Sequence, residues 1–357
     1  MLKLDQNPRL RSATLSLLNW YDRNKRDFPW RSHFGDKPDV YNIWLSEIML
    51  QQTRTVTVCS YYEDFLNQWP TIQELATATQ HDVLKAWAGL GYYTRARNLH
   101  ACAKIVAQKY GGIFPKTEEE LMALPGIGLY TANAIMAIGY NQPSTVVDGN
   151  VRRVISRLYR IDVPLPANSP KIRALAASLT SLRRPGDYAQ AIMDLGATIC
   201  KPRKPNCQKC PWKNICKAWS DGNPENYPKR KLKGKNRRRY GIIYWIERSD
   251  GAIVLRKRPE KGMLAGMIEI PNTEWQDRKL SERSVRTQSP LPISWEPIVG
   301  QITHSFSHFD LELEIISAKS EIKPEGTFWC SRKNLRSEAF PRLMVKVVEH
   351  VEKIRKL

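Results

Sequence analysis

The stretch Leu124-Pro-Gly-Ile-Gly-Leu-Tyr-Thr-Ala-Asn-Ala-Ile135 decides how the first half of this chain folds. Upstream, Thr117-Glu-Glu-Glu120 has the spacing of a capping box and predicts the start of a short helix. The dipeptide Pro125-Gly126 ends that helix, and Gly128 permits a tight turn before a second helix begins near Leu129. A helix–hairpin–helix of this kind presents backbone N–H groups that suit a phosphate. Taken alone, however, the pattern is more typical of an ordinary turn between two helices.

Two further motifs follow the hairpin. The stretch Val146-Val-Asp-Gly-Asn-Val-Arg-Arg153 places a carboxylate just ahead of a basic helix. A C-x6-C-x2-C-x5-C spacing is then formed by Cys200, Cys207, Cys210 and Cys216. Four thiolates so close in sequence predict a soft metal centre, either a [4Fe–4S] cluster or a structural zinc. Disulfides are the alternative, which we disfavour because nothing marks the chain as secreted.

The composition indicates an intracellular protein with a polyanionic partner. The 357 residues are enough for two domains, and the formal net charge is +21. A surface this basic usually binds nucleic acid, although a basic protein without such a partner is the alternative. The start of the chain has no signal-peptide pattern, and no apolar run is long enough to span a membrane. We therefore expect a cytoplasmic protein, associated with the nucleoid in a bacterium, and a monomer.

The hydrophobic pattern changes character near residue 225. Before it, apolar residues recur at helical spacing in 11–21, 41–52, 82–88, 97–109, 151–158, 171–182 and 188–200. The basic stretch 229–239 contains no acidic residue and predicts a solvated linker. Beyond it, strands are predicted at 240–247, 252–257, 298–303 and 311–317, and a closing helix at 341–356.

Together these motifs resemble the endonuclease III superfamily of DNA glycosylases. Within it, the chain is most similar to the MutY family of adenine DNA glycosylases. The narrower resemblance rests on five stretches, namely Phe28-Pro-Trp-Arg31, 44–53, 89–98, Met193-Asp-Leu-Gly-Ala197 and His304-Ser-Phe-Ser-His-Phe309. The resemblance implies an all-α helix–hairpin–helix glycosylase domain (1–225, hairpin 117–138, [4Fe–4S] loop 200–216), a basic linker (226–239) and a MutT/Nudix-like α/β domain (240–357).

The implied reaction removes adenine from a mispair with 8-oxoguanine or guanine in double-stranded DNA. Such chemistry needs a proton on the base and a stabilised sugar cation, hence two carboxyl groups. Glu47 lies in an apolar helical segment, where burial keeps a carboxyl protonated for use as a general acid. Asp148, at the head of a helix, is expected to stay ionised and face the sugar cation, with Asn150 holding it. Without the resemblance, a surface glutamate and an ordinary helix cap would be the simpler interpretation.

Strand-cleaving relatives carry a lysine two residues after the hairpin glycine, where its amine attacks the sugar. Tyr130 occupies that position here, and no lysine lies between Lys116 and Lys171. We therefore expect a monofunctional enzyme that leaves an abasic site. A bifunctional glycosylase/lyase and a non-catalytic damage-binding protein remain as alternatives.

The resemblance also assigns binding roles. Adenine has to leave the base stack to react, and the pocket that receives it is expected to contain Trp30, Arg31, Leu50 and Asp194. The residues expected to contact DNA are Gln52 and Tyr92 as wedges, Gly126 and Gly128 of the hairpin, and Lys201, Arg203 and Lys204 of the cysteine loop. The C-terminal domain is expected to recognise 8-oxoguanine through Phe306, Ser307 and His308. It lacks the Arg-Glu pair of nucleotide-hydrolysing Nudix enzymes.

Overall fold

The computed structural model describes residues 7–31, 38–229, 237–259, 262–306, 308–335, 338 and 340–355. Its chain divides into two compact units, residues 1–78 with 98–232 and residues 79–97 with 233–357. The domain limits expected from the sequence stay a prediction, as do the monomeric state and the location in the cell. Among the described residues, no helix is long and apolar enough to cross a membrane. Ser307 and residues 230–236 of the basic stretch lie outside the described part of the chain.

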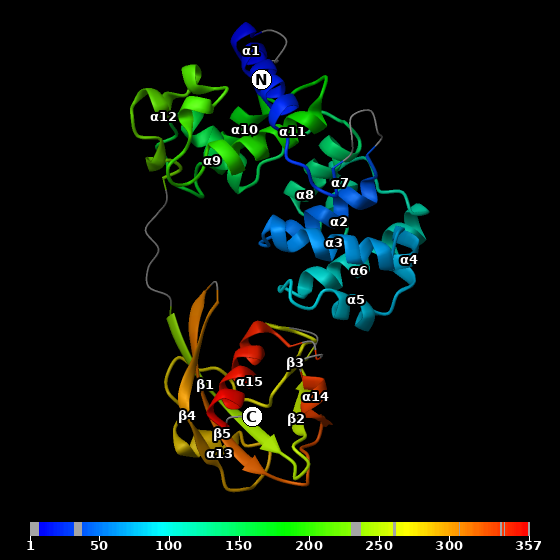
Figure 1. Ribbon diagram of the computed structural model, residues 1–357, viewed down its shortest axis with the longest axis vertical. Coiled ribbons are helices and arrows are strands. Elements are labelled where there is room, and N and C mark those ends of the chain that lie inside the picture. The colour runs from blue at the N-terminus through cyan, green and yellow to red at the C-terminus, as the bar shows by residue number, and fades with distance from the viewer. Residues whose placement is uncertain are drawn as a thin grey trace. The chain divides into compact units, whose positions relative to one another are not determined.

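The first half of the chain is helical (Figure 1). Its helices are α1 (Pro8–Asn24), α2 (Val40–Leu50), α3 (Thr55–Gln68), α4 (Ile72–Thr77), α5 (Gln80–Ala86), α6 (Thr94–Tyr110), α7 (Glu118–Met122), α8 (Leu129–Ala134), α9 (Gly149–Leu158), α10 (Ser169–Ala177), α11 (Pro185–Asp194) and α12 (Lys217–Ser220). Two π-helical turns, η2 (Ile135–Gly139) and η3 (Leu195–Ile199), extend α8 and α11. Each helix expected from periodicity is confirmed with shifted ends, whereas α3, α4 and α12 were not predicted.

One apolar core joins four helices in this part of the chain. It is built from α1, α9, α10 and α11, with Leu17, Ile155 and Ile192 almost fully buried. Trp212 from the cysteine loop inserts into this core, and its indole N–H donates to the Ala13 carbonyl at 2.8 Å. Burial of such large apolar side chains stabilises a fold by about 1.5–3 kcal/mol each. The cysteine loop is therefore anchored to the same core as α9 and α11.

The C-terminal part of the chain is a mixed β-sheet with helices. Its elements are β1 (Arg237–Glu247), β2 (Ile253–Lys257), β3 (Ile268–Glu269), α13 (Glu282–Thr287), β4 (Glu296–Ser305), β5 (Phe309–Lys319), β6 (Thr327–Cys330), α14 (Arg332–Leu335) and α15 (Arg342–Arg355). The strand order is β3-β2-β1-β5-β4, with β6 paired to β2. Strand β1 begins at Arg237, so residues 237–239 are not part of a solvated linker. They form strand because they pair in parallel with residues 309–311 of β5.

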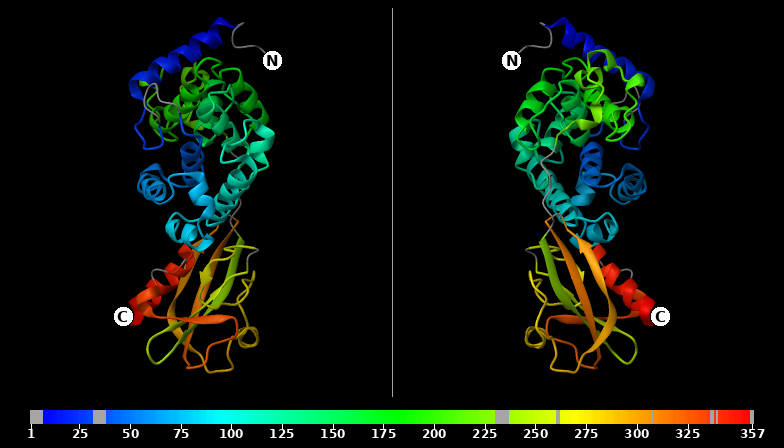
Figure 2. Two further views of the ribbon diagram at one scale, coloured as in Figure 1. Left: turned by 90° about the vertical axis from the view of Figure 1, so that its right-hand side faces the viewer. Right: turned by 90° about the vertical axis from the view of Figure 1, so that its left-hand side faces the viewer.

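Helix α15 covers one face of this sheet, as the red helix beside the strands in Figure 2 shows. Its apolar residues at helical spacing, such as Met344, Val347 and Val351, are fully buried against the core of the sheet. Alternate residues of β5 point into the same core, including Leu311, Leu313 and Ile315. The closing helix and the strand predicted at 311–317 are thus confirmed.

Candidate active site

A cavity of about 740 Å³ lies in the helical unit, and ten of the predicted site residues line it. The predicted residues that line it are Trp30, Arg31, Glu47, Leu50, Gln52, Gly126, Gly128, Tyr130, Asp148 and Asn150. They come from the segment after α1, from α2 and the turn after it, from the hairpin with the start of α8, and from the start of α9. No lysine is among the described residues that line the cavity.

Glu47 is the buried acid of this cavity. Helix α2 is buried on nearly all sides, and Glu47 is only 6% exposed. Burial in these apolar surroundings raises the pKa of Glu47 to about 7, and the negative charge of Asp148 acts in the same direction. A hydrogen bond from Tyr130 and the charge of Arg31 oppose the shift without cancelling it. Glu47 can therefore carry a proton near neutral pH, as the sequence suggested.

Asp148 caps the N-terminus of α9. Its Oδ1 accepts a hydrogen bond from the backbone N–H of Val151 at 2.6 Å, and its Oδ2 accepts one from the Asn150 amide at 2.8 Å. Burial raises the pKa of Asp148 above its ordinary value, although these two hydrogen bonds lower it. The capping geometry fixes the carboxylate at the cavity wall. A capping role and a chemical role are thus compatible at this residue.

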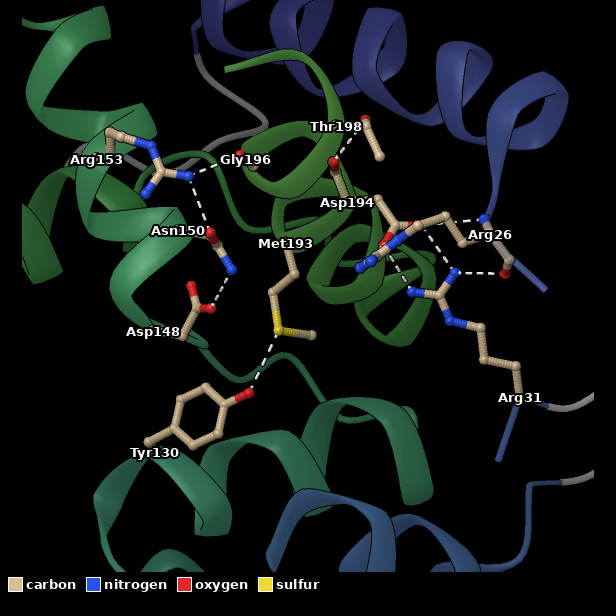
Figure 3. A network of polar contacts seen from close by, with 10 residues as sticks. All are labelled: Arg26, Arg31, Tyr130, Asp148, Asn150, Arg153, Met193, Asp194, Gly196 and Thr198. Carbon is tan, nitrogen blue, oxygen red and sulfur yellow. Dashed lines mark hydrogen bonds and ion pairs between the residues drawn. The ribbon is translucent and has the colours of Figure 1, made fainter. Parts of the chain in front are cut away.

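The hairpin delivers Tyr130 to the same cavity. Gly126 has a positive φ of 78°, and a Cβ at this position would lie 2.9 Å from the Cβ of Asn98, so glycine is needed. Helix α8 follows directly, and Tyr130 Oη donates to the Met193 sulfur at 3.3 Å (Figure 3). Burial and the nearby Glu47 carboxyl raise the pKa of Tyr130 well above its ordinary value. The phenol therefore stays protonated beside Glu47.

Asp194 does not line the cavity, contrary to the expectation from sequence. It is fully buried and bound by two arginines, with Arg31 Nη1 2.7 Å from its Oδ2 and Arg26 Nε 2.7 Å from its Oδ1 (Figure 3). Met193 faces the cavity instead, because successive helix residues point about 100° apart. Burial raises the pKa of Asp194, but the hydrogen bonds and charges of Arg31 and Arg26 outweigh it and lower the pKa. Asp194 thus holds Arg31 from behind.

A row of polar contacts on α9 connects this site with the cysteine loop. Arg153 Nη2 donates to Asn150 Oδ1 at 2.9 Å and to the Gly196 carbonyl at 2.6 Å (Figure 3). The Nε of the same side chain donates to the Cys200 carbonyl at 2.7 Å. One turn later, Arg157 Nη1 lies 3.3 Å from the Cys200 sulfur. Because Asn150 binds Asp148, the position of Asp148 depends on the same contacts that hold the first cysteine.

The four cysteines lie on one loop after η3, and all are half-buried free thiols. Burial raises the pKa of Cys207, Cys210 and Cys216, and the charges of neighbouring thiols raise each of them further. The thiols are therefore within electrostatic reach of one another. Among the described residues, no three His, Cys, Asp or Glu side chains are close enough to hold one metal ion. Four cysteine thiols on one loop are a donor set that suits an iron–sulfur cluster or a zinc ion.

Three predicted cationic residues surround the first part of this loop. The side chains of Lys201, Arg203 and Lys204 are exposed. The Lys204 backbone N–H holds the loop by donating to Glu225 Oε1 at 2.9 Å. Lys204 also has a left-handed φ of 48°. The charges therefore project from a fixed loop into solvent. Their role in DNA binding stays a prediction.

The two predicted wedge residues share an unusual backbone conformation. Gln52 has φ of 59° and Tyr92 has φ of 51°, both in the left-handed region that non-glycine residues rarely adopt. Gln52 lines the cavity, whereas Tyr92 belongs to the other unit and is 57% exposed. Strained residues of this kind are often found at functional sites. Their insertion into DNA is not tested by the geometry.

The predicted recognition loop of the C-terminal domain lies beside a cluster of aromatic rings. Phe306 packs against Trp275, Phe309 and His304, with ring centroids 5.6, 4.9 and 4.7 Å away. His308 is exposed, and Ser307 lies outside the described residues. The aromatic contacts fix Phe306 at the end of β4, while His308 is free to reach a partner.

Sequence reasoning missed three residues that shape the cavity. Phe28 stacks on Trp30 with ring centroids 4.8 Å apart and planes 14° apart, and the Arg26 guanidinium lies 4.7 Å from the Phe28 ring centre. Met193, the acceptor of the Tyr130 hydroxyl, was also not foreseen. Phe28 and Met193 both lie inside stretches quoted above for their family resemblance, so the signal was present. Arg26 precedes those stretches and gave no separate signal.

Comparison with known proteins agrees with this geometry. Residues 45–176 match the family model of the HhH-GPD superfamily base excision DNA repair proteins, and residues 242–350 match a NUDIX domain. The human adenine DNA glycosylase is 35% identical, covering 93% of this chain and 72% of the human protein. The adenine DNA glycosylase of Buchnera aphidicola subsp. Baizongia pistaciae is 33% identical, covering 95% and 96%.

A solved structure is similar to the helical part. The structure of a thermostable thymine-DNA glycosylase is 28% identical and superimposes with a TM-score of 0.54, covering 60% of this chain and all of the other. The expected fold class, a helical glycosylase domain followed by a Nudix-like domain, is confirmed. The chain therefore belongs to the MutY family of adenine DNA glycosylases in the endonuclease III superfamily, hydrolases of N-glycosyl bonds in base excision repair.

Proposed function

We propose that this chain removes adenine opposite 8-oxoguanine or guanine by hydrolysis and leaves an abasic site in an uncut strand. The observation that carries the proposal is the buried Glu47, whose pKa is raised to about 7, in one cavity with Asp148. Two carboxyl groups with different surroundings are what an acid-assisted glycosidic cleavage requires.

Glu47 supplies the proton in this proposal. Adenine is a poor leaving group, and protonation of its ring weakens the bond to the sugar. A carboxyl with a pKa near 7 is partly protonated at physiological pH, unlike an ordinary glutamate. After the base has left, the resulting carboxylate can accept a proton from the attacking water. Tyr130, held between Glu47 and Met193, restricts the carboxyl to one region of the cavity.

Asp148 stabilises the positive charge that develops on the sugar. Its two hydrogen-bond donors, the Val151 backbone N–H and the Asn150 amide, keep the carboxylate oriented. The charge acts either electrostatically or through a covalent bond to the sugar carbon. Arg153 holds Asn150 in turn, so Asn150 is a positioning residue for Asp148.

The cavity is suited to an extruded purine. The stacked rings of Phe28 and Trp30 present an aromatic surface, and Leu50 adds an apolar contact. Arg31 offers N–H donors to the base edge, and Asp194 fixes their direction. We propose that Gln52 and Tyr92 insert into the gap that adenine leaves in the base stack of the duplex. The hairpin at Gly126 and Gly128 and the loop at Lys201, Arg203 and Lys204 are assigned to the phosphates.

Strand cleavage is not expected, because no lysine is among the described residues that line the cavity. Tyr130 occupies the position of the lysine in strand-cleaving relatives. A lyase reaction through a Schiff base needs such an amine. The bifunctional alternative is therefore disfavoured.

The four cysteines are proposed to hold a [4Fe–4S] cluster. When bound, the cluster would fix the loop through four thiolate bonds, and its iron could take part in electron transfer. Residues of this chain also hold the loop in place. Arg157 donates to the Cys200 sulfur and to the carbonyls of Lys201 and Pro202, so it orders the loop that presents three cations.

The Nudix-like domain is proposed to recognise the base opposite adenine. Phe306 is fixed by its aromatic neighbours and can pack against a base pair. The His308 imidazole and the Ser307 hydroxyl are assigned to the base edge. Nucleotide hydrolysis is not proposed, because the sequence lacks the Arg-Glu pair that such enzymes use for metal binding.

The test is a single-turnover assay on a duplex with one adenine opposite 8-oxoguanine, analysed with and without alkali. We expect product only after alkali, because an abasic site breaks under alkali and an intact strand does not. Nicking without alkali would contradict the monofunctional proposal. No product in either case would contradict adenine removal opposite 8-oxoguanine and leave a binding protein.

A further inference from the structure

A second cavity of about 480 Å³ lies in the helical unit, separate from the candidate active site. Among its walls are residues of α7, α8, α9 and α10 and the segment 143–147. Its polar lining includes Glu118, Asn133, Ser144, Thr145, Arg152 and Arg173. Tyr130 lines both cavities, so the second one is separated from Glu47 by this ring. None of the roles given above involves its two arginines.

Arg152 has a buried donor that nothing satisfies. Its Nε is inaccessible to solvent and has no hydrogen-bond partner. Among the described residues, neither the Arg152 nor the Arg173 side chain forms a hydrogen bond or an ion pair. A buried unpaired donor is costly, and such groups are rare in folded proteins unless an ion or water completes them. The Arg152 Nε–H therefore lacks an acceptor.

The other polar groups of the cavity are already engaged with one another. Asn133 Nδ2 donates to Glu118 Oε2 at 2.8 Å, and Ser144 Oγ donates to Asn133 Oδ1 at 2.6 Å. The Thr145 hydroxyl lies 3.1 Å from that of Thr180. The cavity lining thus contains two arginines, of which Arg173 is exposed, and a single carboxylate that is bound to an amide. The balance of charge and of free donors favours an anion.

We propose that this cavity binds a phosphate group through Arg152 and Arg173. Guanidinium groups bind phosphate oxygens through parallel N–H···O hydrogen bonds, which are strong and directional. The phosphate comes either from the backbone of bound DNA or from a free phosphate ion. The first source rests on the proposed function, whereas the second does not. In both cases the ligand lies behind Tyr130 and limits the movement of that ring.

The first test uses inorganic phosphate and the full chain. Isothermal titration calorimetry with phosphate is compared for wild type, Arg152→Gln, Arg173→Gln and Arg183→Gln. Arg183 is an exposed arginine outside the cavity and provides the matched loss of charge. We expect each cavity variant to weaken phosphate binding roughly tenfold or more, and Arg183→Gln to change it little. In wild type, phosphate should also slow the modification of Arg152 by phenylglyoxal, measured by mass spectrometry. This measurement needs no variant, so it does not depend on whether a variant folds.

The second test distinguishes the two sources. Binding of an undamaged duplex is measured by fluorescence anisotropy at several salt concentrations. If the phosphate belongs to DNA, each cavity variant lowers the slope of log Kd against log salt by about 0.9 relative to Arg183→Gln. If the ligand is instead free phosphate, the cavity variants bind DNA like wild type but no longer bind phosphate. Unchanged binding of both ligands, with no protection of Arg152, would overturn the proposal. Since neither test uses adenine removal, failure of the proposed reaction would not be mistaken for failure of this site.

Discussion

Two buried carboxyl groups in this protein, Glu47 and Asp194, have pKa values that are shifted in opposite directions. Glu47 is surrounded mainly by apolar residues of α2, and its pKa is raised to about 7. Asp194 is buried even more completely, yet Arg26 and Arg31 lower its pKa. Burial alone therefore does not decide the protonation of a carboxyl group. The number of cationic partners decides it.

The difference separates a reactive group from a structural one. A carboxyl without a cationic hydrogen-bond partner holds its proton loosely near neutral pH and can give it to a base. A carboxylate with two guanidinium partners is locked in the charged state and orients them. Arg31 belongs to both regions, because it binds Asp194 and lowers the pKa of Glu47 through its charge.

The largest expected effect is on the reactive side of the comparison. Glu47→Gln keeps the size of the side chain but removes the proton donor. We expect the single-turnover rate of adenine removal to fall by about 10³-fold, because acid–base catalysis by one group contributes roughly 10²–10⁴-fold. Binding to duplex DNA should be nearly unchanged. A rate within tenfold of wild type would exclude Glu47 as the acid.

The structural side is tested by Asp194→Asn. This substitution leaves two arginines next to a neutral group, and Arg31 is only 10% exposed. Loss of one partner of a buried ion pair costs about 3–5 kcal/mol, so we expect the free energy of unfolding to fall by about 3 kcal/mol in urea. The control is Asp22→Asn, which breaks the exposed pair with Arg184 and should cost under about 1 kcal/mol. Equal effects of both variants would contradict a structural role specific to Asp194.

The raised pKa of Glu47 also predicts a pH dependence of stability. Between pH 4.5 and about 7 the carboxyl has lost its proton in the unfolded chain but keeps it in the folded one, so stability falls as pH rises. Glu47→Gln removes this penalty. Relative to wild type, the variant should gain about 3 kcal/mol of stability between pH 4 and pH 8. Urea unfolding at both pH values measures this, and parallel behaviour of the two proteins would argue against the shifted pKa.

A smaller effect is expected where η3 meets α9. A Cβ on Gly196 would lie 2.6 Å from the Cβ of Asn150, so Gly196→Ala has to displace the residue that holds Asp148. We expect a loss of about 2 kcal/mol in stability and a slower reaction with little change in DNA affinity. The control Gly149→Ala meets no atom within 4 Å and should behave like wild type. If the two alanine variants react equally fast, the contact between η3 and Asn150 does not position Asp148.

Local sequence patterns predicted the elements that carry strong signals. Helices with caps and apolar periodicity, such as α9 after Asp148, were found because the deciding interactions lie within a few residues. Helix α3 was missed because apolar residues off its buried face, such as the exposed Val56, obscure the helical spacing of the buried Val58, Tyr62 and Phe65. Strand β6 was missed because it is only four residues long and is defined by its pairing with β2.

Site residues could be predicted where they lie within a recognisable sequence motif. They could not be predicted where their position depends on a partner that is distant in the sequence. Glu47, Asp148 and Tyr130 lie together in the cavity, as the motifs indicated. The position of Asp194 depends on Arg26, which is 168 residues away in the sequence. No local pattern reports such a pair. For the same reason the second cavity, which joins Arg152 and Arg173 to Tyr130, appears only in the folded chain.

The most direct test of the central claim is the pH profile of the wild-type single-turnover rate on an adenine·8-oxoguanine duplex. If Glu47 acts as a general acid with a pKa of about 7, the rate should fall about tenfold for each pH unit above that value. The fall should be absent from the residual activity of Glu47→Gln. A wild-type rate that stays constant from pH 6 to pH 9 would contradict the account.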